Sequence, residues 1–432
     1  MIRWIYRQIY NVALNLLLPV ALLRLWWRGR HAPAYRQRIG ERMGWYVPPH
    51  PCALWVHAVS VGETVAAVPL IQAVLQNQPH LTVMVTNTTP TGAERVRTLL
   101  GATVAQAYLP WDRPAAVKRW IRHLKPQVLV IMETELWPNL LAIAQAEGVW
   151  IILANARLSA RSAQGYGRWP GLVRPMLHCL HQVAAQDAAT AERLQWLGVP
   201  AERIAVTGSL KFDAQRPAFD RQQLREQRTP GRFPVVVAGS THAGEESLIL
   251  QAFTDFRQHY PQALLILVPR HPERFAEVTQ LLQSGGWSMQ RRSDAETLRS
   301  DTAVWLGDTM GEMLLWYAMA DIALVAGSLR QELGGHNMLE PVLLGVPTLS
   351  GHYVLNFQTI AEILVQAGAL RLVEAGELSS VWQELMQRPA LRQAMVQAGE
   401  QVLSANRGAL QRQVALVLHA LARTQRTTAL PT

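Results

Sequence analysis

A repeated order of short apolar runs and helical stretches constrains the fold of this chain more than any other feature. From Cys52 onward each apolar run is followed by a turn and a helical stretch, such as Thr64–Gln76 or Ala188–Leu197. Short, continuous apolar runs are typical of strands buried on both faces. The first series is Leu54–His57, Leu81–Thr86, Val104–Leu109, Val128–Met132, Trp150–Ala154, Val183–Gln186 and Ile204–Thr207. Strands that alternate with helices predict a parallel, doubly wound sheet.

The rhythm breaks at residues 209–233, which contain Pro217, Pro230 and many polar residues, and then resumes. The second series is Val235–Ala238, Leu264–Val268, Ala303–Leu306, Ile322–Ala326, Thr348–Leu349 and Leu370–Val373. A chain of 432 residues is long for one core, so two domains are expected. We predict an α/β protein with two Rossmann-like domains at 31–208 and 234–421. A linker at 209–233 joins them, a polar tail occupies 422–432, and a substrate cleft lies between the domains.

The N-terminal segment, residues 1–30, is both basic and apolar. Residues 1–42 hold eight arginines and one acid, Glu41, although the whole chain carries a net charge of only +10. The apolar run Ile9–Leu23 would span roughly 22 Å as a helix, short of the roughly 30 Å hydrocarbon core. Arg3, Arg7, Asn11 and Asn15 recur every four residues and form a polar stripe, which makes the first half of the segment amphipathic. We predict an uncleaved membrane anchor or interfacial helix, with a buried helix as the alternative.

Other classes of protein are disfavoured by composition. The two cysteines, Cys52 and Cys179, lie far apart without metal-ligand spacing, which predicts neither a disulfide framework nor a zinc site. The basic charge brackets an apolar segment and is not spread over a surface with interleaved aromatic residues, so no nucleic-acid partner is expected. Phosphate-loop, kinase and G-x-S-x-G hydrolase motifs are absent from the sequence.

In the first domain, Trp55–Thr64 (W-V-H-A-V-S-V-G-E-T) reads as a strand, a small-residue turn and a helix that opens at Glu63. A carboxylate at this corner would sit at the carboxyl edge of the sheet, where open α/β folds bind ligands. Alternatively, Glu63 satisfies amides of the first helical turn. From the residues alone, both interpretations stay open.

In the second domain, Ala326–Pro341 (A-G-S-L-R-Q-E-L-G-G-H-N-M-L-E-P) follows a predicted strand. Gly334 and Gly335 allow a close backbone approach, and Asn337 with Glu340 has the spacing of a capping box. The exposed amides of such a turn suit a phosphate. A capped helix without a ligand is the alternative.

Other turns also follow predicted strands. Arg270 and Arg274 stand in V-P-R-H-P-E-R-F, where two prolines stiffen the loop, and Gly307–Met313 is G-D-T-M-G-E-M. His242 lies in G-S-T-H-A-G-E and Lys211 in G-S-L-K-F-D. In the first domain E-T-E-L-W-P-N carries two glutamates, but no D-x-D pair or His/Cys/Asp cluster accompanies them, so no metal site is predicted.

Together these motifs resemble the 3-deoxy-D-manno-octulosonic acid (Kdo) transferases, which add Kdo to the lipid A precursor of Gram-negative bacteria. The resemblance covers nearly the whole chain. It includes V-S-V-G-E-T, T-N-T-T-P-T-G, E-T-E-L-W-P-N, N-A-R-L-S, G-S-L-K-F-D, P-R-H-P-E-R, G-D-T-M-G-E-M and G-G-H-N-M-L-E-P.

The resemblance implies an inverting, metal-independent glycosyltransferase of the GT-B type, without a cofactor. It would transfer Kdo from CMP-Kdo to the lipid A precursor (lipid IVA) in lipopolysaccharide core biosynthesis, on the cytoplasmic face of the inner membrane. Glu63 would be the general base. The resemblance places CMP at Pro269, Arg270, Gly311, Glu312, Met313, Asn337, Met338, Leu339 and Glu340. Candidate substrate contacts are Ser60, Gly62, Lys211 and His242.

Two other functions remain open. Another GT-B nucleotide-sugar transferase or an epimerase, acting at the membrane surface, would share the fold but prefer a uridine nucleotide. A non-enzymatic membrane- or nucleic-acid-binding protein would explain the basic N-terminus, but it would not explain several anion-suited turns at strand ends.

Overall fold

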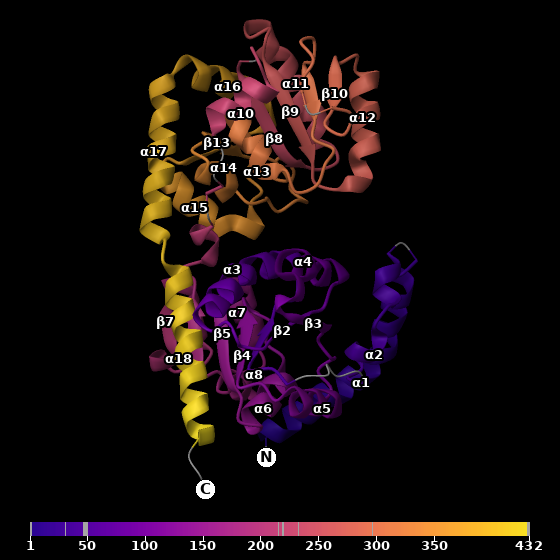
Figure 1. Ribbon diagram of the computed structural model, residues 1–432, viewed down its shortest axis with the longest axis vertical. Helices are drawn as coiled ribbons and strands as arrows, with labels where there is room; N and C mark the ends of the chain where they lie inside the picture. Colours follow the sequence, from indigo (N-terminus) through magenta and orange to yellow (C-terminus); the bar gives the residue numbers. More distant parts are fainter. Residues whose placement is uncertain are drawn as a thin grey trace. The chain divides into compact units, whose positions relative to one another are not determined.

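Seven parallel strands form the sheet of the first unit, drawn in purple in Figure 1. In the computed structural model, which describes residues 2–30, 32–45, 51–214, 216–217, 220–231, 233–295 and 297–429, the spatial order is β3-β2-β1-β4-β5-β6-β7. The strands are β1 (Leu54–His57), β2 (Val83–Asn87), β3 (Ala105–Tyr108), β4 (Val128–Met132), β5 (Trp150–Ala156), β6 (Gln182–Ala185) and β7 (Ile204–Val206). Because β1 pairs with both β2 and β4, the strand order reverses between β1 and β4.

A second sheet of seven parallel strands has the order β10-β11-β9-β8-β12-β13-β14. Its strands are β8 (Val235–Thr241), β9 (Leu264–Pro269), β10 (Met289–Arg291), β11 (Val304–Leu306), β12 (Ile322–Val325), β13 (Thr348–Ser350) and β14 (Leu370–Leu372). Here the order reverses between β8 and β12. The predicted α/β class with two doubly wound parallel sheets is therefore confirmed.

One strand, β10, is missing from the sequence prediction. Its residues Met289, Gln290 and Arg291 form a short edge strand that pairs with β11. Only Gln290 of this strand is buried, whereas Met289 and Arg291 are half-buried. An edge strand of this kind does not need the continuous apolar run that marks the central strands.

Helices cover both faces of each sheet. Those of the first unit are α1 (Ile2–Arg28), α2 (Ile39–Arg42), α3 (Val61–Asn77), α4 (Pro90–Leu100), α5 (Pro114–Leu124), α6 (Pro138–Ala146), α7 (Ala160–Gly167), α8 (Pro170–Leu177), α9 (Ala188–Trp196) and α18 (Ala409–Ala429). Those of the second are α10 (Arg221–Arg228), α11 (Glu245–His259), α12 (Phe275–Ser284), α13 (Met313–Met319), α14 (Leu339–Leu343), α15 (Gln358–Gln366), α16 (Leu378–Gln387) and α17 (Pro389–Asn406). The short helices η1–η4 (Pro33–Arg36, Gly101–Thr103, Ala201–Arg203 and Leu210–Asp213) belong to the first unit, and η5–η7 (Pro272–Arg274, Leu355–Phe357 and Ala375–Glu377) belong to the second.

Alternate residues of the strands supply two cores in the first unit. Trp55 and Leu129 face one core, whereas Leu54 and Val128 face the other, as the two-residue period of a strand requires. All four side chains are at most 1% exposed. This double burial explains why the central strands are recognisable as continuous apolar runs.

The chain divides differently from the predicted domains at its C-terminal end. The two compact units are Met1–Asp213 with Arg407–Thr432, and Ala214–Asn406. Helix α18 returns to the first unit because its apolar face, including Val417 and Leu421, packs in that unit's core. Residues 407–421 therefore do not belong to the second domain, and the predicted tail from residue 422 continues α18 as far as Ala429.

The predicted linker, residues 209–233, also differs. Residues Leu210–Asp213 form η4 in the first unit, where the Asp213 carboxylate accepts hydrogen bonds from the amides of Gly408 and Leu410 at the start of α18. Helix α10 is docked on the second unit through Arg221, which donates to the carbonyls of Ala318, Ala320 and Leu344. Residues 215, 218, 219 and 232 of this stretch, and 430–432 of the tail, lie outside the described residues.

Candidate active site

Glu63 lies at the corner between β1 and α3, at the carboxyl end of the strand beside the order reversal of the first sheet. Ser60 caps α3, its side chain accepting a hydrogen bond from the Glu63 amide. In return, the Glu63 carboxylate accepts from the Val59 amide (2.7 Å) and from the Ser60 hydroxyl (2.9 Å). The capping role that the sequence left open is therefore present, and it fixes the carboxylate in one orientation.

Burial raises the pKa of Glu63 to about 7, and the hydrogen bonds from Val59 and Ser60 oppose this shift. The negative charges of Glu133 and Glu135 add to the rise in pKa. Only 8% of Glu63 is exposed. A carboxylate with a pKa near neutrality can both hold and release a proton at physiological pH, which is the property of a general base.

Glu133 connects two predicted site residues that lie far apart in sequence. It directly follows β4, the neighbour of β1, and its left-handed backbone (φ 57°) is uncommon for a residue other than glycine. Its charge acts on Glu63 and also on Lys211 of η4, where burial lowers the lysine pKa and Glu133 opposes that effect. The structure therefore groups Glu63, Glu133 and Lys211 in the first unit, whereas the sequence placed Lys211 in a linker.

The predicted contacts of the first unit differ in exposure. Ser60 is half-buried by its bonds to Glu63. Gly62 is exposed, and a Cβ at this position would lie 3.9 Å from the Ser60 hydroxyl oxygen, an ordinary contact distance. Glu133 was overlooked as a neighbour of Glu63, although E-T-E directly after a strand signals its position. What the sequence lacked was the strand order that makes β4 adjacent to β1.

In the second unit, the predicted CMP-binding loops follow β9, β11 and β12, and the His242 loop follows β8. These four strands are consecutive in the sheet and parallel, so all four loops emerge at one edge. The Arg270 amide donates to the Thr241 carbonyl (3.0 Å), which joins the β9 and β8 loops. This edge includes the order reversal, where open α/β sheets place their ligands.

His242 and His336 face one another across that reversal. Their Nε2 atoms are 2.9 Å apart and their rings are stacked, so one nitrogen donates the hydrogen bond and the other accepts it. Burial, together with the charge of Arg270, lowers the pKa of His336 to about 3, and burial also lowers the pKa of His242. Both rings are therefore neutral at physiological pH. The sequence identified His242 but missed His336, although it stands beside Asn337 in G-G-H-N.

Arg270 is an exposed cation of this edge. Among the described residues its guanidinium has no ion-pair partner, whereas Arg274 is bound to Glu246 and Glu277. The charge of Arg270 lowers the pKa of His336 and opposes the burial that raises the pKa of Glu340. Arg270 is therefore positioned to bind an anion, and Arg274 has a structural role.

The Asn337–Glu340 turn differs in detail from the sequence prediction. Asn337 accepts from the Leu339 amide and donates to the Glu340 carboxylate, each at 3.2 Å, and α14 begins at Leu339. The side chains of Met338 and Leu339 are buried in the core (0% and 2% exposed), so only their main chain can contact a nucleotide. Because α14 has only five residues, its helix dipole is small, and individual backbone amides matter more for binding an anion.

The turn at Gly311–Met313 has a similar division between side chain and main chain. Gly311 has a left-handed backbone (φ 87°). The Glu312 carboxylate is held by Arg292 (3.0 Å) and by the Thr309 hydroxyl. Met313 reaches toward Gly239 of β8, where a Cβ would lie 3.0 Å from its sulfur. The side chain of Glu312 is thus occupied, which leaves its main chain for a ligand. Pro269 ends β9 and presents Arg270.

Glu245 fixes the loops of β8 and β12 together. This side chain is fully buried, and its two oxygens accept four backbone amides, those of His242, Gly327, Ser328 and Leu329, at 2.8–3.0 Å. Carboxylates that accept several amides are strongly bound. Glu245 therefore sets the geometry of the segment that leads into His336 and Asn337.

The loop after β13 supports the glycine turn from the other side. The Asn356 amide donates to the Gly334 carbonyl (2.8 Å), and a Cβ on Gly335 would lie 3.0 Å from the Val354 backbone. The two glycines are therefore required by close packing, as the sequence suggested. A hollow of about 480 Å³ beside this loop is lined by residues that include Leu333, Leu355 and Glu362, and contains none of the predicted site residues.

Comparisons with known proteins define the class. A glycosyltransferase from Rickettsia africae superposes with a TM-score of 0.57 at 11% identity, over 86% of this chain and 99% of that one. A UDP-GlcNAc 2-epimerase from Neisseria meningitidis superposes with a TM-score of 0.56 at 15% identity, over 86% and 99% of the two chains. At these identities the likeness shows the fold alone. The fold is that of the GT-B glycosyltransferases.

Sequence relatives show the family. The family model described as 3-deoxy-D-manno-octulosonic-acid transferase (kdotransferase) matches residues 37–214. A 3-deoxy-D-manno-octulosonic acid transferase from Haemophilus influenzae is 39% identical over 415 residues, which cover 94% of this chain and 97% of that protein. The chain therefore belongs to the Kdo transferase family, and it is a glycosyltransferase whose family activity is Kdo transfer. The epimerase alternative is not favoured.

We expect Glu245→Gln to destabilise the second unit. The amide nitrogen would face two backbone donors, and each buried donor left unpaired costs about 1–3 kcal/mol, so the free energy of unfolding should fall by about 2–6 kcal/mol. Denaturant unfolding of the purified protein measures this change. The control is Glu332→Gln, at an exposed carboxylate paired with Arg330, where a change within about 0.5 kcal/mol is expected. Equal stabilities of the two variants would show that Glu245 does not hold the loops.

Proposed function

We propose that this chain transfers Kdo from CMP-Kdo to a hydroxyl group of the lipid A precursor, in lipopolysaccharide core biosynthesis. The acceptor oxygen attacks the anomeric carbon of Kdo as the bond from that carbon to the CMP phosphate breaks. Glu63 accepts the hydroxyl proton, and CMP leaves with the bonding electrons. Attack on the face opposite the leaving group inverts the anomeric configuration.

The observation that carries this proposal is the Glu63 carboxylate, in a chain of this family. Its two hydrogen bonds fix its direction, and its pKa of about 7 suits proton transfer near neutral pH. Gly62 beside it is exposed, and we assign the solvent-facing space next to Gly62 and Ser60 to the acceptor. Lys211 and the glutamates after β4 complete the charges around this corner.

We assign the CMP moiety to the second unit. Arg270 supplies a cation without an ion-pair partner among the described residues, and it would neutralise the departing phosphate. Main-chain groups of Gly311, Glu312 and Met313, and of the turn from Asn337 to Glu340, would hold the rest of the nucleotide. His242 lies beside Arg270 and would contact the transferred sugar or the leaving group. Within the described residues, no cluster of three His, Cys, Asp or Glu is arranged to hold a metal ion. In the proposed mechanism, side chains and main-chain amides neutralise the charge of the departing phosphate.

In this mechanism the base and the donor belong to different units, and a cleft between them remains a prediction. Closure of one unit onto the other would assemble the reacting groups and exclude water. We place both units on the cytoplasmic face of the inner membrane, because the CMP-activated donor is made in the cytoplasm. Helix α1 would bring the enzyme to its lipid acceptor.

Glu63→Gln separates the capping role from the catalytic role. Glutamine keeps an oxygen that can accept the Val59 amide, but it cannot take a proton. We expect turnover with CMP-Kdo and lipid IVA to fall by about 10²–10⁴-fold, with unchanged CMP affinity by calorimetry. Glu192→Gln, at an exposed glutamate of α9 in the same unit, is the control. Near-normal turnover of Glu63→Gln would remove Glu63 from the mechanism.

Arg270→Ala tests the donor site. Loss of a charge-assisted hydrogen bond to phosphate is worth about 1.5–3 kcal/mol, so the dissociation constant of CMP should rise by about 10- to 150-fold. Calorimetry with CMP measures this change, and competition with UDP reports nucleotide preference. Arg299→Ala serves as the control, because Arg299 is exposed and its guanidinium contacts Asp301 (3.4 Å) and the Met289 carbonyl (3.0 Å). An unchanged CMP affinity in Arg270→Ala would refute the assignment.

A further inference from the structure

One face of α1 is an exposed apolar stripe. Its members recur every three or four residues, which places them on one side of a helix, and each is between 58% and 73% exposed. They are Ile9, Val12, Leu16, Val20, Leu23 and Trp27. We call this set the α1 stripe. Among the described residues, α1 is the one helix long and apolar enough to cross a membrane, so length alone permits either a spanning or an in-plane arrangement.

The opposite face of the first half of α1 is fixed to the first unit by polar contacts. Arg7 donates to the Asn139 side chain (3.0 Å), which in turn donates to Asn11 (2.7 Å). Tyr10 donates to the buried Asp112 carboxylate (2.9 Å), which also accepts the amides of Asn139 and Leu140 at the start of α6. Arg7 and Asn11 are members of the polar stripe that the sequence showed, and these contacts explain why those two positions are polar.

This polar contact limits how much of α1 can enter a bilayer. A residue bonded to Asn139 or Asp112 stays with the first unit, because removing it would leave buried polar groups unpaired. The remainder, from Leu16 to Arg28, rises about 20 Å, against the roughly 30 Å that a spanning helix must cover. Helix α1 can therefore not span a bilayer while its first half stays docked.

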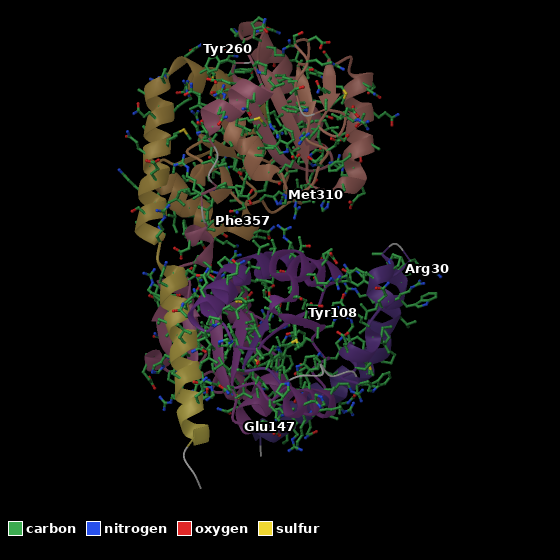
Figure 2. All side chains as sticks on the ribbon, viewed as in Figure 1. Arg30, Tyr108, Glu147, Tyr260, Met310 and Phe357 are labelled. Carbon is green, nitrogen blue, oxygen red and sulfur yellow. The ribbon has the colours of Figure 1, made fainter. Side chains whose placement is uncertain are left out.

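Basic and aromatic side chains gather where α1 ends. Arg30, labelled at the far end of α1 in Figure 2, lies over the Trp26 ring at 4.6 Å, and Arg36 lies over the same ring at 4.9 Å. Arg28 lies over Tyr35 at 5.3 Å. Tryptophan and arginine at such a position are typical of the membrane interface, where the ring meets the acyl boundary and the cation meets lipid phosphates.

We propose that α1 lies in the plane of one leaflet, with the α1 stripe in the acyl region and the arginines on anionic phospholipid headgroups. The excess of positive charge near α1 favours a membrane over a second copy of the chain as the partner that covers the α1 stripe. Glu41 is the single acid among the first 42 residues, and it is bound to Arg38, so pairing two copies along α1 would bring cations together. Anionic lipid complements them.

The side from which residue 8 is accessible tests this arrangement. Gln8→Cys and His80→Cys are each made in the full chain, whose native Cys52 and Cys179 are buried. Right-side-out and inverted membrane vesicles from producing cells are then treated with an impermeant maleimide. We expect both cysteines to react from the same side, because the start of α1 stays with the first unit. Reaction of residue 8 from the opposite side only, or from neither side, would overturn the proposal.

A binding measurement tests the stripe itself. Leu16→Asp should weaken flotation of the full chain with phosphatidylglycerol–phosphatidylethanolamine vesicles by about tenfold or more, and phosphatidylcholine vesicles should bind the parent protein less well. Leu355→Asp is the matched control, because Leu355 of the second unit is 71% exposed and Leu16 is 73% exposed. Equal binding of the two variants would overturn the proposal.

The proposed membrane role of α1 rests on the proposed function, but vesicle binding and Kdo transfer can be measured separately. Transfer to detergent-solubilised lipid IVA should be the same for Leu16→Asp and the parent, since the acceptor no longer has to be reached in a bilayer. Vesicles without lipid IVA show whether phospholipid alone is the ligand, and binding that requires the acceptor would overturn the proposal. Loss of transfer in the parent protein itself would contradict the proposed function and leave the vesicle result standing.

Discussion

The parallel strand order is the constraint on which the rest of this structure depends. In each unit the first strand, β1 or β8, lies inside the sheet, and later strands are added on both sides of it. The residues that follow the two adjacent strands at this order reversal are therefore brought together. In the first unit these are Glu63 after β1 and Glu133 after β4. In the second they are His242 after β8 and His336 after β12. Residues some 70 to 100 positions apart in the chain become neighbours because their strands are adjacent and parallel.

The same hydrogen bonds that stabilise the corner of β1 also orient the carboxylate of Glu63, the proposed general base. The Val59 amide and the Ser60 hydroxyl hold its oxygens, and burial keeps the pKa of the carboxyl near 7. A cap that was fully exposed would hold the orientation but not the raised pKa. In the second unit, Glu245 has a purely architectural task, since its four amide bonds position the loops that carry His336 and Asn337.

The sequence predicted the central strands best, because the side chains on both faces of these strands are buried. The central strands are continuous apolar runs because helices cover both their faces, and each therefore has a readable pattern. Helix α18 was assigned to the wrong unit because its partners, such as Leu70 and Val130, lie hundreds of residues earlier. Likewise, α10 has a polar sequence that resembles a linker, yet Arg221 and Arg225 dock it through carbonyls and Asp321.

The sequence predicted where the candidate site residues lie in the fold better than it predicted their side-chain contacts. Motifs placed Arg270 and Glu63 at sheet edges, but only the structure shows that Glu312 is occupied by Arg292, or that Met338 and Leu339 turn their side chains inward. These are consequences of tertiary packing, and a local pattern does not contain them. His336 and Glu133 were missed for the same reason, since each gains its significance from a strand that is not its neighbour in sequence.

The most direct test of the central claim is the pH dependence of kcat/KM for Kdo transfer to lipid IVA. Glu63 acts as a base only when ionised, so a raised pKa predicts loss of activity as the pH falls through about 7. The account predicts a rate that declines about tenfold per pH unit below that point, and a residual rate in Glu63→Gln without this inflection. An inflection near the ordinary glutamate pKa of about 4.3, or one that persists in Glu63→Gln, would contradict it.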